Sequence, residues 1–367
     1  QLDWEQWRWC LKFLAQCNDT AFERNVQQIV ALGAYSHAAL KDVVRATGIQ
    51  YHRLECGIAH FYSDQKSLDE AGHAVEVMRK FGVQRRLVSR AELLQIEPAF
   101  SAYGERITGG TYTSTDESGD ARLFTQQLAR RCAERGAQFL YGHDVLRLNK
   151  TGNTIDSVAV SAIQSGATGQ KHSILKGDAI VVACGSYSAP LLRSVGVDLP
   201  IYPGKGYSAT FDIVRPEAAP SVSVLDDEVK CAVSRLGNTL RVAGTIELNG
   251  YDLSLDTPLA RARCDMLARR VAQVFPGVCD TRSAAEGGNP RFWTGLRPAT
   301  PTNIPFIGQT RLRGLWVNAG HGTLGWTHGA GSGKALAELI SGERPAMAFD
   351  FLGEGRQRQH RRAAVGT

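Results

Sequence analysis

The feature that most constrains the fold is a short, uninterrupted apolar run near the middle of the chain, DAIVVACG at residues 178–185. An apolar run of this length that ends in glycine is typical of a parallel strand buried on both faces. A second strand is expected at Leu315–Asn318, followed by a glycine-rich loop from Gly320 to Gly333 and a closing helix over Lys334–Ile340. A strand, a glycine loop and a helix in this order predict an α/β layer that can hold a cofactor.

The rest of the chain alternates between helical and strand patterns, as chains with mixed layers do. Helices are predicted across Trp4–Leu14, Asn25–Thr47, Leu68–Phe81, 90–97, Leu123–Glu134 and Leu259–Phe275, and strands within Ile49–Tyr62, 138–142, 145–150, 153–176 and 201–246. Two local signals support the boundaries: Gly48 ends the second helix, and Ser89 with Glu92 forms a capping box.

Length and composition limit the remaining choices. At 367 residues the chain has room for two cores, so two domains are expected. Its net charge of +6 is interspersed with acids except in the tail from Arg356 to Arg362, which argues against nucleic acid as a partner. No apolar run approaches the roughly 18 residues that cross a bilayer. The eight cysteines include no CxxC pair, which favours reduced thiols in a cytoplasm over a disulfide framework or a metal site.

The first predicted helix leaves two interpretations open. Trp4, Trp7 and Trp9 lie among Arg8 and Lys12 and give the helix a wide aromatic surface. The helix either docks on the protein core or lies at a membrane interface, where tryptophan beside lysine and arginine suits the headgroup level.

Two glycine clusters imitate nucleotide-binding motifs without the required context. The string GKGYSA at 204–209 fits a GxGxxA pattern, but residues 210–214 continue as a strand where a dinucleotide fingerprint needs a helix. Residues 329–334 resemble a P-loop, but His328 stands at the first glycine position and Ala335 replaces the Ser or Thr that would hold magnesium. Neither cluster is therefore interpreted as a phosphate loop.

The glycine loop and one arginine carry the candidate chemistry. Backbone without side chains approaches a planar ring closely, and the free N–H groups of a following helix favour an electron-rich edge such as that of a reduced flavin. A turn that serves only to pack the chain is the alternative. Arg297, in the string WTGLRP, stands beside a rigid proline and suits bidentate capture of a carboxylate, although an ordinary ion pair would use the same residue type.

Several longer strings, in the same order and with similar spacing, resemble one family. They are TGGTYTSTDESGDARLFTQQLA, GSYSAPLL, YPGKGYS, FWTGLRPATP, IPFIG and NAGHGTLGWTHGAGSG. In these strings the chain is similar to the small subunit of bacterial D-amino acid dehydrogenases, within the glycine oxidase and D-amino acid oxidase superfamily. The resemblance covers essentially the whole chain, to about Leu352.

This resemblance implies a two-domain flavoprotein of the D-amino acid oxidase type, α/β plus α+β, with a Rossmann-like FAD domain and a mixed-sheet substrate domain. The FAD domain would use residues 118–195 and 291–342, the substrate domain 1–117 and 196–290, and residues 343–367 would form a tail. Members of the family begin with a strand, a GxGxxG turn and a helix, and roughly 75 to 80 residues of this kind are expected to be missing. They would be truncated or lie on another polypeptide, and FAD binding would depend on them.

The resemblance also implies site residues. Arg297 would clamp the substrate carboxylate, and Tyr207 would form a pocket wall, with a core aromatic as the alternative for Tyr207. The implied cofactor contacts are Val145 at the adenine end, Ala183 and Gly185 at the end of a strand, and Gly320, His321, Gly322, Thr323, Leu324 and Gly325 at the isoalloxazine. The segment His52–Gly57 would line the pocket, and no metal site is expected.

The implied activity is FAD-dependent oxidative deamination of D-amino acids, such as D-alanine, to 2-oxo acids and ammonia, with electrons passed to a quinone or a carrier protein. Two alternatives stay open. One is a dehydrogenase or oxidase of another amine (cis-4-hydroxy-D-proline, glycine, sarcosine or an opine) within a hetero-oligomer; the other is a non-catalytic fragment or scaffold subunit. A cytoplasmic location, with peripheral contact at the inner face of the cell membrane, is expected.

Overall fold

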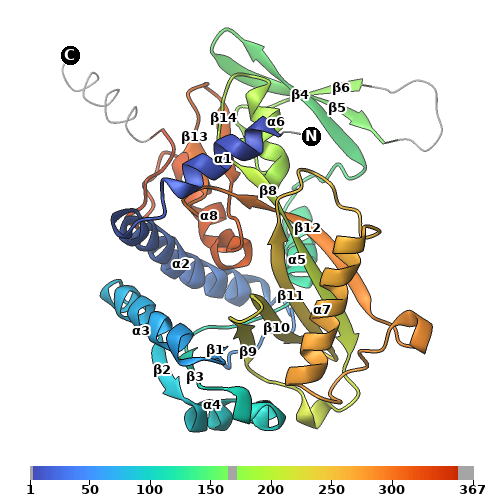
Figure 1. Cartoon of the computed structure of the whole chain (residues 1–367). Coiled ribbons are helices and arrows are strands. Elements are labelled where there is room, and N and C mark those ends of the chain that lie inside the picture. The colour runs from blue at the N-terminus through green and yellow to red at the C-terminus, as the bar shows by residue number, and fades with distance from the viewer. Residues whose placement is uncertain (1–2, 164–171, 354–367) are drawn as a thin grey trace. The chain divides into compact units, whose positions relative to one another are not determined.

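The computed structural model describes residues 3–163 and 172–353. The chain divides into two compact units (Figure 1). Unit 1 is built from the segments Gln1–Gly48, Arg130–Gly204 and Arg297–Thr367, and unit 2 from Ile49–Ala129 and Lys205–Leu296.

Each unit contains both helices and strands. Unit 1 holds α1 (Trp4–Leu14), α2 (Asp19–Thr47), β4 (His143–Thr151), β5 (Thr154–Ala162), β6 (His172–Lys176), β7 (Ile180–Val182), α6 (Ser188–Arg193), β13 (Phe306–Gln309), β14 (Leu315–Ala319) and α8 (Gly325–Ile340). Unit 2 holds β1 (Ile58–Tyr62), α3 (Gln65–Lys80), β2 (Arg86–Ser89), α4 (Arg90–Ile96), β3 (Gly109–Thr113), β9 (Ser223–Asp226), β10 (Cys231–Leu236), β11 (Thr239–Glu247) and α7 (Pro258–Val274). Three elements have residues in both segment sets: α5 (Ala121–Ala133), β8 (Tyr202–Asp212) and β12 (Arg291–Ala299).

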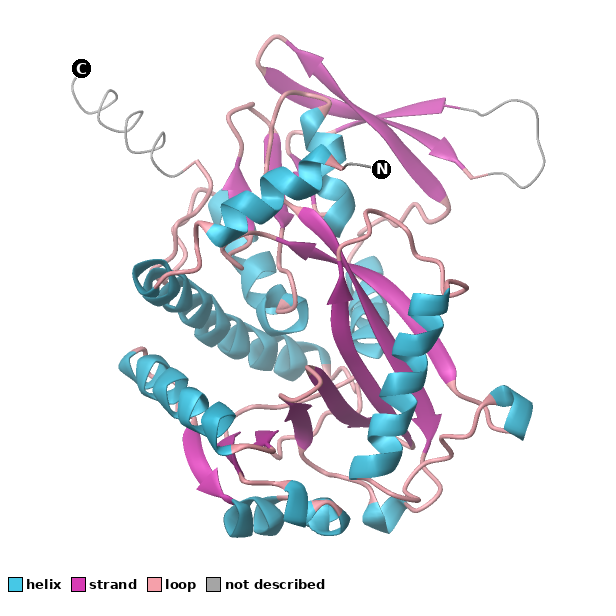
Figure 2. Cartoon of the chain, viewed as in Figure 1, coloured by secondary structure: helices cyan, strands magenta, loops and turns pink. Residues whose placement is uncertain are grey.

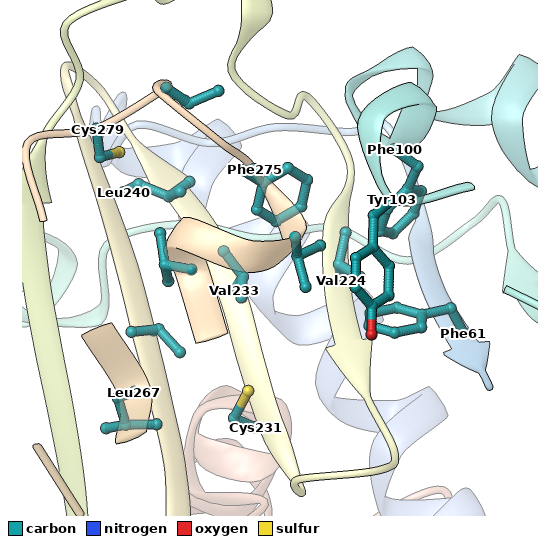
Figure 3. Packing of buried hydrophobic residues seen from close by; sticks show 14 of the residues in the cluster. Phe61, Phe100, Tyr103, Val224, Cys231, Val233, Leu240, Leu267, Phe275 and Cys279 are labelled. Atoms are coloured by element: carbon teal, nitrogen blue, oxygen red, sulfur yellow. The ribbon is translucent and has the colours of Figure 1, made fainter. Parts of the chain in front are cut away.

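Unit 2 is organised by an eight-stranded sheet in the order β12-β8-β11-β10-β9-β1-β3-β2. Alternate residues of its central strands, such as Ala209, Val233 and Val242, are buried in one hydrophobic cluster with the apolar side of α7. Figure 2 shows α7 running along these strands, and Figure 3 shows Phe275 gathered with Val233 and Leu240 in the cluster. The burial of one sheet face beneath a helix is the main source of hydrophobic stabilisation in this unit.

Unit 1 contains two three-stranded sheets. In the first, with the order β13-β14-β7, β7 and β14 are parallel, and Leu315 pairs with Ile180. In the second, β4, β5 and β6 form an antiparallel meander. A hydrophobic cluster with Ile155, Val182 and Val317 contains side chains from both sheets.

The long helix α2 lies against α8, and the two helices approach very closely at one point (Figure 1). A Cβ atom at Gly331 would lie 2.6 Å from the Cα atom of Ser36, and the Gly331 N–H donates a hydrogen bond of 3.0 Å to the Ser36 hydroxyl. The segment that contains α1 and α2 belongs to unit 1; its assignment to a substrate domain stays a prediction.

Several local predictions are confirmed. Helix α2 ends at Gly48, whose φ of 65° is left-handed, and the capping box of Ser89 and Glu92 begins α4. Residues 204–209 lie within β8 and are not a phosphate loop. All eight cysteines are unpaired.

Four predictions are wrong in part. Residues 138–142 form no strand, because no neighbouring strand among the described residues pairs with them. The strand expected over Ile49–Tyr62 is limited to β1. The strand β7 is not buried on both faces, since Val181 is 42% exposed. The glycine loop ends at Leu324, because the following glycines are helical and Gly331 provides the close approach to α2.

Candidate functional site

The parallel pairing of β7 and β14 determines where the candidate site lies in unit 1. Val317 is opposite Val182, so the two strands end side by side. Residues 183–185 and the loop 320–324 therefore leave the sheet at the same edge. Ligands of α/β proteins bind outside the carboxyl ends of parallel strands, which is where most of the predicted cofactor residues are placed.

Three glycines shape the backbone at this edge. Gly320, with a φ of 91°, cannot carry a side chain because its Cβ would lie 2.8 Å from a methyl carbon of Thr300. Gly185 and Gly322 also have positive φ values, 55° and 53°; nothing lies within 4 Å of a Cβ atom at Gly185, and a Cβ atom at Gly322 would meet only the Asn303 Oδ1 atom, at 3.9 Å. The last two positions thus combine a left-handed backbone with room for a ligand to approach the main chain.

The first turn of α8 begins directly after this loop. Its N-cap position is Leu324, which provides no side-chain hydrogen bond to the helix. An uncapped helix start presents N–H groups and the positive end of the helix dipole. Gly325 at the first helical position keeps this end accessible, because only the Cβ of His321 comes within 4 Å of the place where a Gly325 side chain would begin.

Arg297 is connected to the loop through its neighbour in β12. The N–H of Gly322 donates to the carbonyl of Pro298 at 2.9 Å, which joins the end of β12 to the glycine loop. Burial lowers the pKa of Arg297 from its ordinary value. A guanidinium nevertheless keeps its proton throughout the physiological range. The site therefore contains a permanent, partly buried cation.

Two histidines accompany the loop and α8. The Nε2 atom of His321 lies 3.1 Å from the hydroxyl of Ser332. Burial lowers the pKa of His321 to about 4, and burial together with the nearby His321 lowers the pKa of His328 to about 4. Both rings are therefore neutral near pH 7. The roles of Ser332 and His328 were not predicted from the sequence. This stretch was expected to be a loop, whereas in a helix residues four positions apart lie on the same side.

Tyr207 lies in a different setting, within unit 2. Its side chain is fully buried in the cluster beneath α7, and its hydroxyl donates to Glu247. Burial and the hydrogen bond to Glu247 raise the pKa of Tyr207. The surroundings are those of a core aromatic, the alternative that the sequence left open, and a contact with substrate stays a prediction.

The remaining predicted residues are distributed over both units. Val145 is an exposed residue of β4, opposite Val160, on the meander and not on the edge formed by β7 and β14. Ala183 is exposed directly after β7, and Thr323 is exposed in the glycine loop. In unit 2, His52 adopts a left-handed φ of 53° and its ring lies against Gly237.

No helix in the described ranges is long and apolar enough to cross a bilayer. No group of three or more His, Cys, Asp or Glu side chains among the described residues is arranged to hold a metal ion.

Comparisons with known proteins agree with this architecture. The D-amino acid dehydrogenase of Dechloromonas aromatica is 46% identical over 347 residues, which are 95% of this chain and 79% of that protein. The D-amino acid dehydrogenase of Methylobacterium radiotolerans is 41% identical over 348 residues, 95% of this chain and 78% of that protein.

Solved structures show the same fold. Glycine oxidase from Geobacillus kaustophilus superposes with a TM-score of 0.70 at 22% identity, covering 86% of this chain and 79% of that one. L-proline dehydrogenase from P. horikoshii superposes with a TM-score of 0.71 at 19% identity, covering 88% and 81%. The family model described as FAD dependent oxidoreductase (DAO) matches residues 7–339. The chain therefore belongs to the DAO family of FAD-dependent oxidoreductases.

Proposed function

We propose that this protein catalyses the oxidative deamination of D-amino acids such as D-alanine, releasing a 2-oxo acid and ammonia and passing the electrons to a quinone or another carrier. The observation that carries the proposal is the placement of Arg297, since the Gly322–Pro298 hydrogen bond joins its strand to the glycine loop. The two D-amino acid dehydrogenases that resemble the chain at 46% and 41% identity support the substrate class.

The residues at the ends of β7 and β14 fit the flavin that the family uses. Gly185 and Gly322 have left-handed backbones whose Cβ positions meet no atom closer than 3.9 Å, and α8 starts without a side-chain cap. We expect residues 183–185 and 320–325 to hold the flavin through main-chain groups. When bound, the flavin accepts a hydride from Cα of the substrate.

Arg297 would bind the substrate carboxylate. A guanidinium presents two parallel N–H donors to the two oxygens of a carboxylate, and this pairing determines direction as well as distance. Its partial burial strengthens the attraction, because less water screens the charges. The contribution of Arg297 to the reaction is therefore orientation of the substrate.

His321 would assist as a neutral hydrogen-bond partner. With a pKa of about 4 its ring is neutral near pH 7 and is a weak base. Ser332 holds its Nε2 atom, which leaves the Nδ1 side of the ring for a contact with the cofactor. We therefore assign His321 to cofactor binding and not to acid–base catalysis.

A further polypeptide segment would complete the FAD site. Phe139 and Tyr141 are exposed in the segment between α5 and β4, and Val181 is exposed on β7. Large apolar side chains that lie exposed together are normally covered by another chain segment. The curated relatives have room for such a segment, because the chain spans 79% and 78% of their lengths.

Helix α1 supports peripheral contact with a membrane. One side is attached to unit 1: Trp9 donates to the carbonyl of Ala299 at 2.9 Å, and Arg8 pairs with Asp198 at 2.9 Å. The other side exposes a stripe of large apolar residues, Trp4, Trp7, Leu11 and Leu14, with Lys12 beside it. Tryptophans on an amphipathic helix enter the interfacial region of a bilayer.

Vesicle binding tests this contact. Replacing Trp4 and Trp7 together by Ser should reduce cosedimentation with vesicles containing anionic lipid by about tenfold, since two interfacial anchors are removed. The matched control is Leu259→Ser, which alters an exposed apolar residue of α7 in unit 2. Equal binding by all three proteins would count against a role for α1.

Anaerobic flavin absorbance tests the reaction itself. The FAD-loaded protein is mixed with D-alanine or L-alanine, and the flavin band near ~450 nm is followed. Bleaching by the D isomer alone is the expected result. Bleaching by sarcosine, glycine or an opine, without bleaching by D-alanine, would move the assignment to another amine. A protein that retains no flavin even when the further segment is supplied would support a non-catalytic scaffold.

A further inference from the structure

The glycine loop of unit 1 carries one imidazole ring that is tied to the helix after the loop. His321 lies between Gly320 and Gly322, and its Nε2 atom is 3.1 Å from the hydroxyl of Ser332 in α8. The same hydroxyl donates to the carbonyl of Gly329 at 3.2 Å, one helical turn earlier. These two contacts form a chain of hydrogen bonds from the ring to the backbone of α8, and all its members belong to unit 1.

This chain determines which ring nitrogen of His321 carries the proton. A serine hydroxyl has a single hydrogen, and a carbonyl oxygen can only accept one. Because Ser332 gives its hydrogen to Gly329, its oxygen is left as an acceptor, and Nε2 of His321 supplies the N–H. The ring is neutral near pH 7, since burial lowers its pKa to about 4. A neutral imidazole with its proton on Nε2 has none on Nδ1, which is therefore a hydrogen-bond acceptor.

The start of α8 favours the same tautomer. The N–H of Leu324 donates to the carbonyl of His321 at 2.9 Å, and the Cβ of His321 lies 3.9 Å from the place where a Gly325 side chain would begin. His321 is thus held beside a helix start that has no side-chain cap. The positive end of a helix dipole repels a further N–H and attracts a lone pair. A bare Nδ1 atom is therefore the more stable arrangement at this position.

The protein itself does not use this acceptor. Nδ1 of His60 lies 2.8 Å from a carboxylate oxygen of Asp227, whereas no described residue forms a hydrogen bond to Nδ1 of His321. The atom is also not fully buried, as both ring nitrogens of His328 are. Surface histidines leave a nitrogen to water as well, but their rings turn freely and change tautomer. His321 differs because α8 fixes its ring as an acceptor, ready for a ligand that brings a donor.

The flavin has one ring donor for such an acceptor. The isoalloxazine of an oxidised flavin carries a single N–H group, at N3, between two carbonyl oxygens. The main-chain N–H groups of an uncapped helix start are donors, so they suit the carbonyl oxygens and cannot bind N3–H. Recognition of N3–H requires an acceptor, and His321 places one beside these donors.

We propose that Nδ1 of His321 accepts a hydrogen bond from the N3–H group of the bound flavin, and that Ser332 is the positioning residue that holds the ring in this tautomer. This inference rests on the proposed binding of the flavin by residues 183–185 and 320–325. His321 binds the cofactor and moves no proton, and Ser332 acts only through His321. The loop thereby distinguishes a flavin from a ring of the same shape that has no donor at N3.

Nitrogen-15 NMR of protein labelled at histidine tests the tautomer without any flavin. The signals of His321 are identified by their loss in His321→Gln. At pH 7 we expect a protonated Nε2 and an unprotonated Nδ1. Ser332→Ala should shift both signals toward the average of the two tautomers, because Nε2–H loses its acceptor. The matched control Ser341→Ala removes an exposed hydroxyl at the end of α8 and should shift neither signal. A proton on Nδ1 of the wild-type protein, which requires no variant to observe, would overturn the inference.

Flavin affinity, measured with the further segment supplied, tests the partner of Nδ1. The wild-type protein should bind FAD at least about tenfold more tightly than FAD methylated at N3, which has no donor there. His321→Leu has no acceptor and should reduce this ratio to within about threefold. Equal affinities of the wild-type protein for the two flavins would refute the contact with N3–H.

Two further results separate the remaining possibilities. FAD without the 2′-hydroxyl of its ribityl chain should bind as FAD does; a loss of affinity for this analogue alone would assign His321 to a sugar hydroxyl and overturn the contact with N3–H. If the protein binds no flavin at all, the proposed function fails, while the NMR measurement still decides whether Ser332 holds His321 as an acceptor.

Discussion

The apolar strands of the two units lie in different surroundings. In unit 2, Tyr207 and Phe211 of β8 are completely buried beneath α7. In unit 1, β7 has an equally apolar sequence, but Val181 is 42% exposed, and the turn before β4 leaves Tyr141 76% exposed. The two units thus present similar sequence patterns with opposite degrees of burial.

The difference shows what an apolar pattern reports. An apolar strand is stable when other parts of the protein cover it, and those parts can be distant in the sequence. Unit 2 provides its own covering helix, so pattern and burial agree. In unit 1 the described residues leave part of the apolar surface uncovered, and its order depends more on the contact between α2 and α8 and on the loop that links β14 to α8. Variants that disturb one of these contacts at a time test whether the two units are stabilised in different ways.

The largest expected effect concerns the two arginines of β12, one in each unit. Arg297→Ala should lower kcat/KM for D-alanine by about a thousandfold, since loss of the carboxylate clamp leaves Cα misaligned, while flavin content is unchanged. Arg291→Ala, the control, removes an ion pair with Asp212 at the exposed start of the same strand and should cost less than about threefold. A loss of less than about tenfold in Arg297→Ala would contradict its role as the clamp.

The second prediction compares the cores directly. Leu267 of α7 is fully buried, so Leu267→Ala should lower the free energy of unfolding by about 3 kcal/mol through lost burial and the cavity that remains. Val181→Ala on the exposed part of β7 should cost less than about 1 kcal/mol. Urea unfolding followed by circular dichroism measures both. Equal losses would mean that Val181 is covered in solution, and the contrast between the units would disappear.

Local signals in the sequence were sufficient for much of the fold. Gly48 predicted the end of α2, because glycine adopts the left-handed conformation without a steric penalty. Ser89 predicted the start of α4, because its hydroxyl caps a backbone N–H three residues later. These features depend on neighbours in the chain.

Features that depend on distant segments were not predictable in the same way. Gly331 suggested a loop by its low helix propensity, but it lies in α8 because only glycine allows Ser36 of α2 so close. For Tyr207 the sequence left a pocket wall and a core aromatic open, because its side of β8 is determined by strand register and by α7. The hydrogen bond from Arg241 to Ser208 was not predicted. Alternation along β11 did indicate that Arg241 and Ala243 lie on the same face of the sheet.

The third prediction tests the contact between α2 and α8, which helps to stabilise unit 1. Gly331→Ala should destabilise the protein by about 1–3 kcal/mol, because the new methyl group would meet the backbone of α2. Gly329→Ala is the matched control in the same helix: no atom lies within 4 Å of its Cβ position, and the better helix propensity of alanine should stabilise by up to about 1 kcal/mol. Thermal unfolding distinguishes the two. Equal shifts in Tm would rule out a close contact between α2 and α8.

The smallest effect concerns the acid stability of unit 1. His321 and His328 have pKa values lowered to about 4 by burial, against about 6.5 for an unfolded histidine. The unfolded chain therefore binds protons first on acidification, so the stability that the neutral rings provide is complete above about pH 6.5 and falls as the pH drops toward 4. Each ring should cost about 1–2 kcal/mol between pH 7 and pH 5.

His328→Gln tests this linkage, because glutamine does not titrate. Urea unfolding at pH 7 and pH 5 should show that the variant loses less stability on acidification than the wild-type protein does, whatever its stability at pH 7. His73→Gln changes an exposed histidine of α3 in unit 2 and should leave the wild-type pH dependence intact. If His328→Gln and the wild-type protein lost the same amount, the ring would have to be accessible to protons in the folded state, and the contact of α2 with α8 would be looser than the Gly331–Ser36 geometry requires.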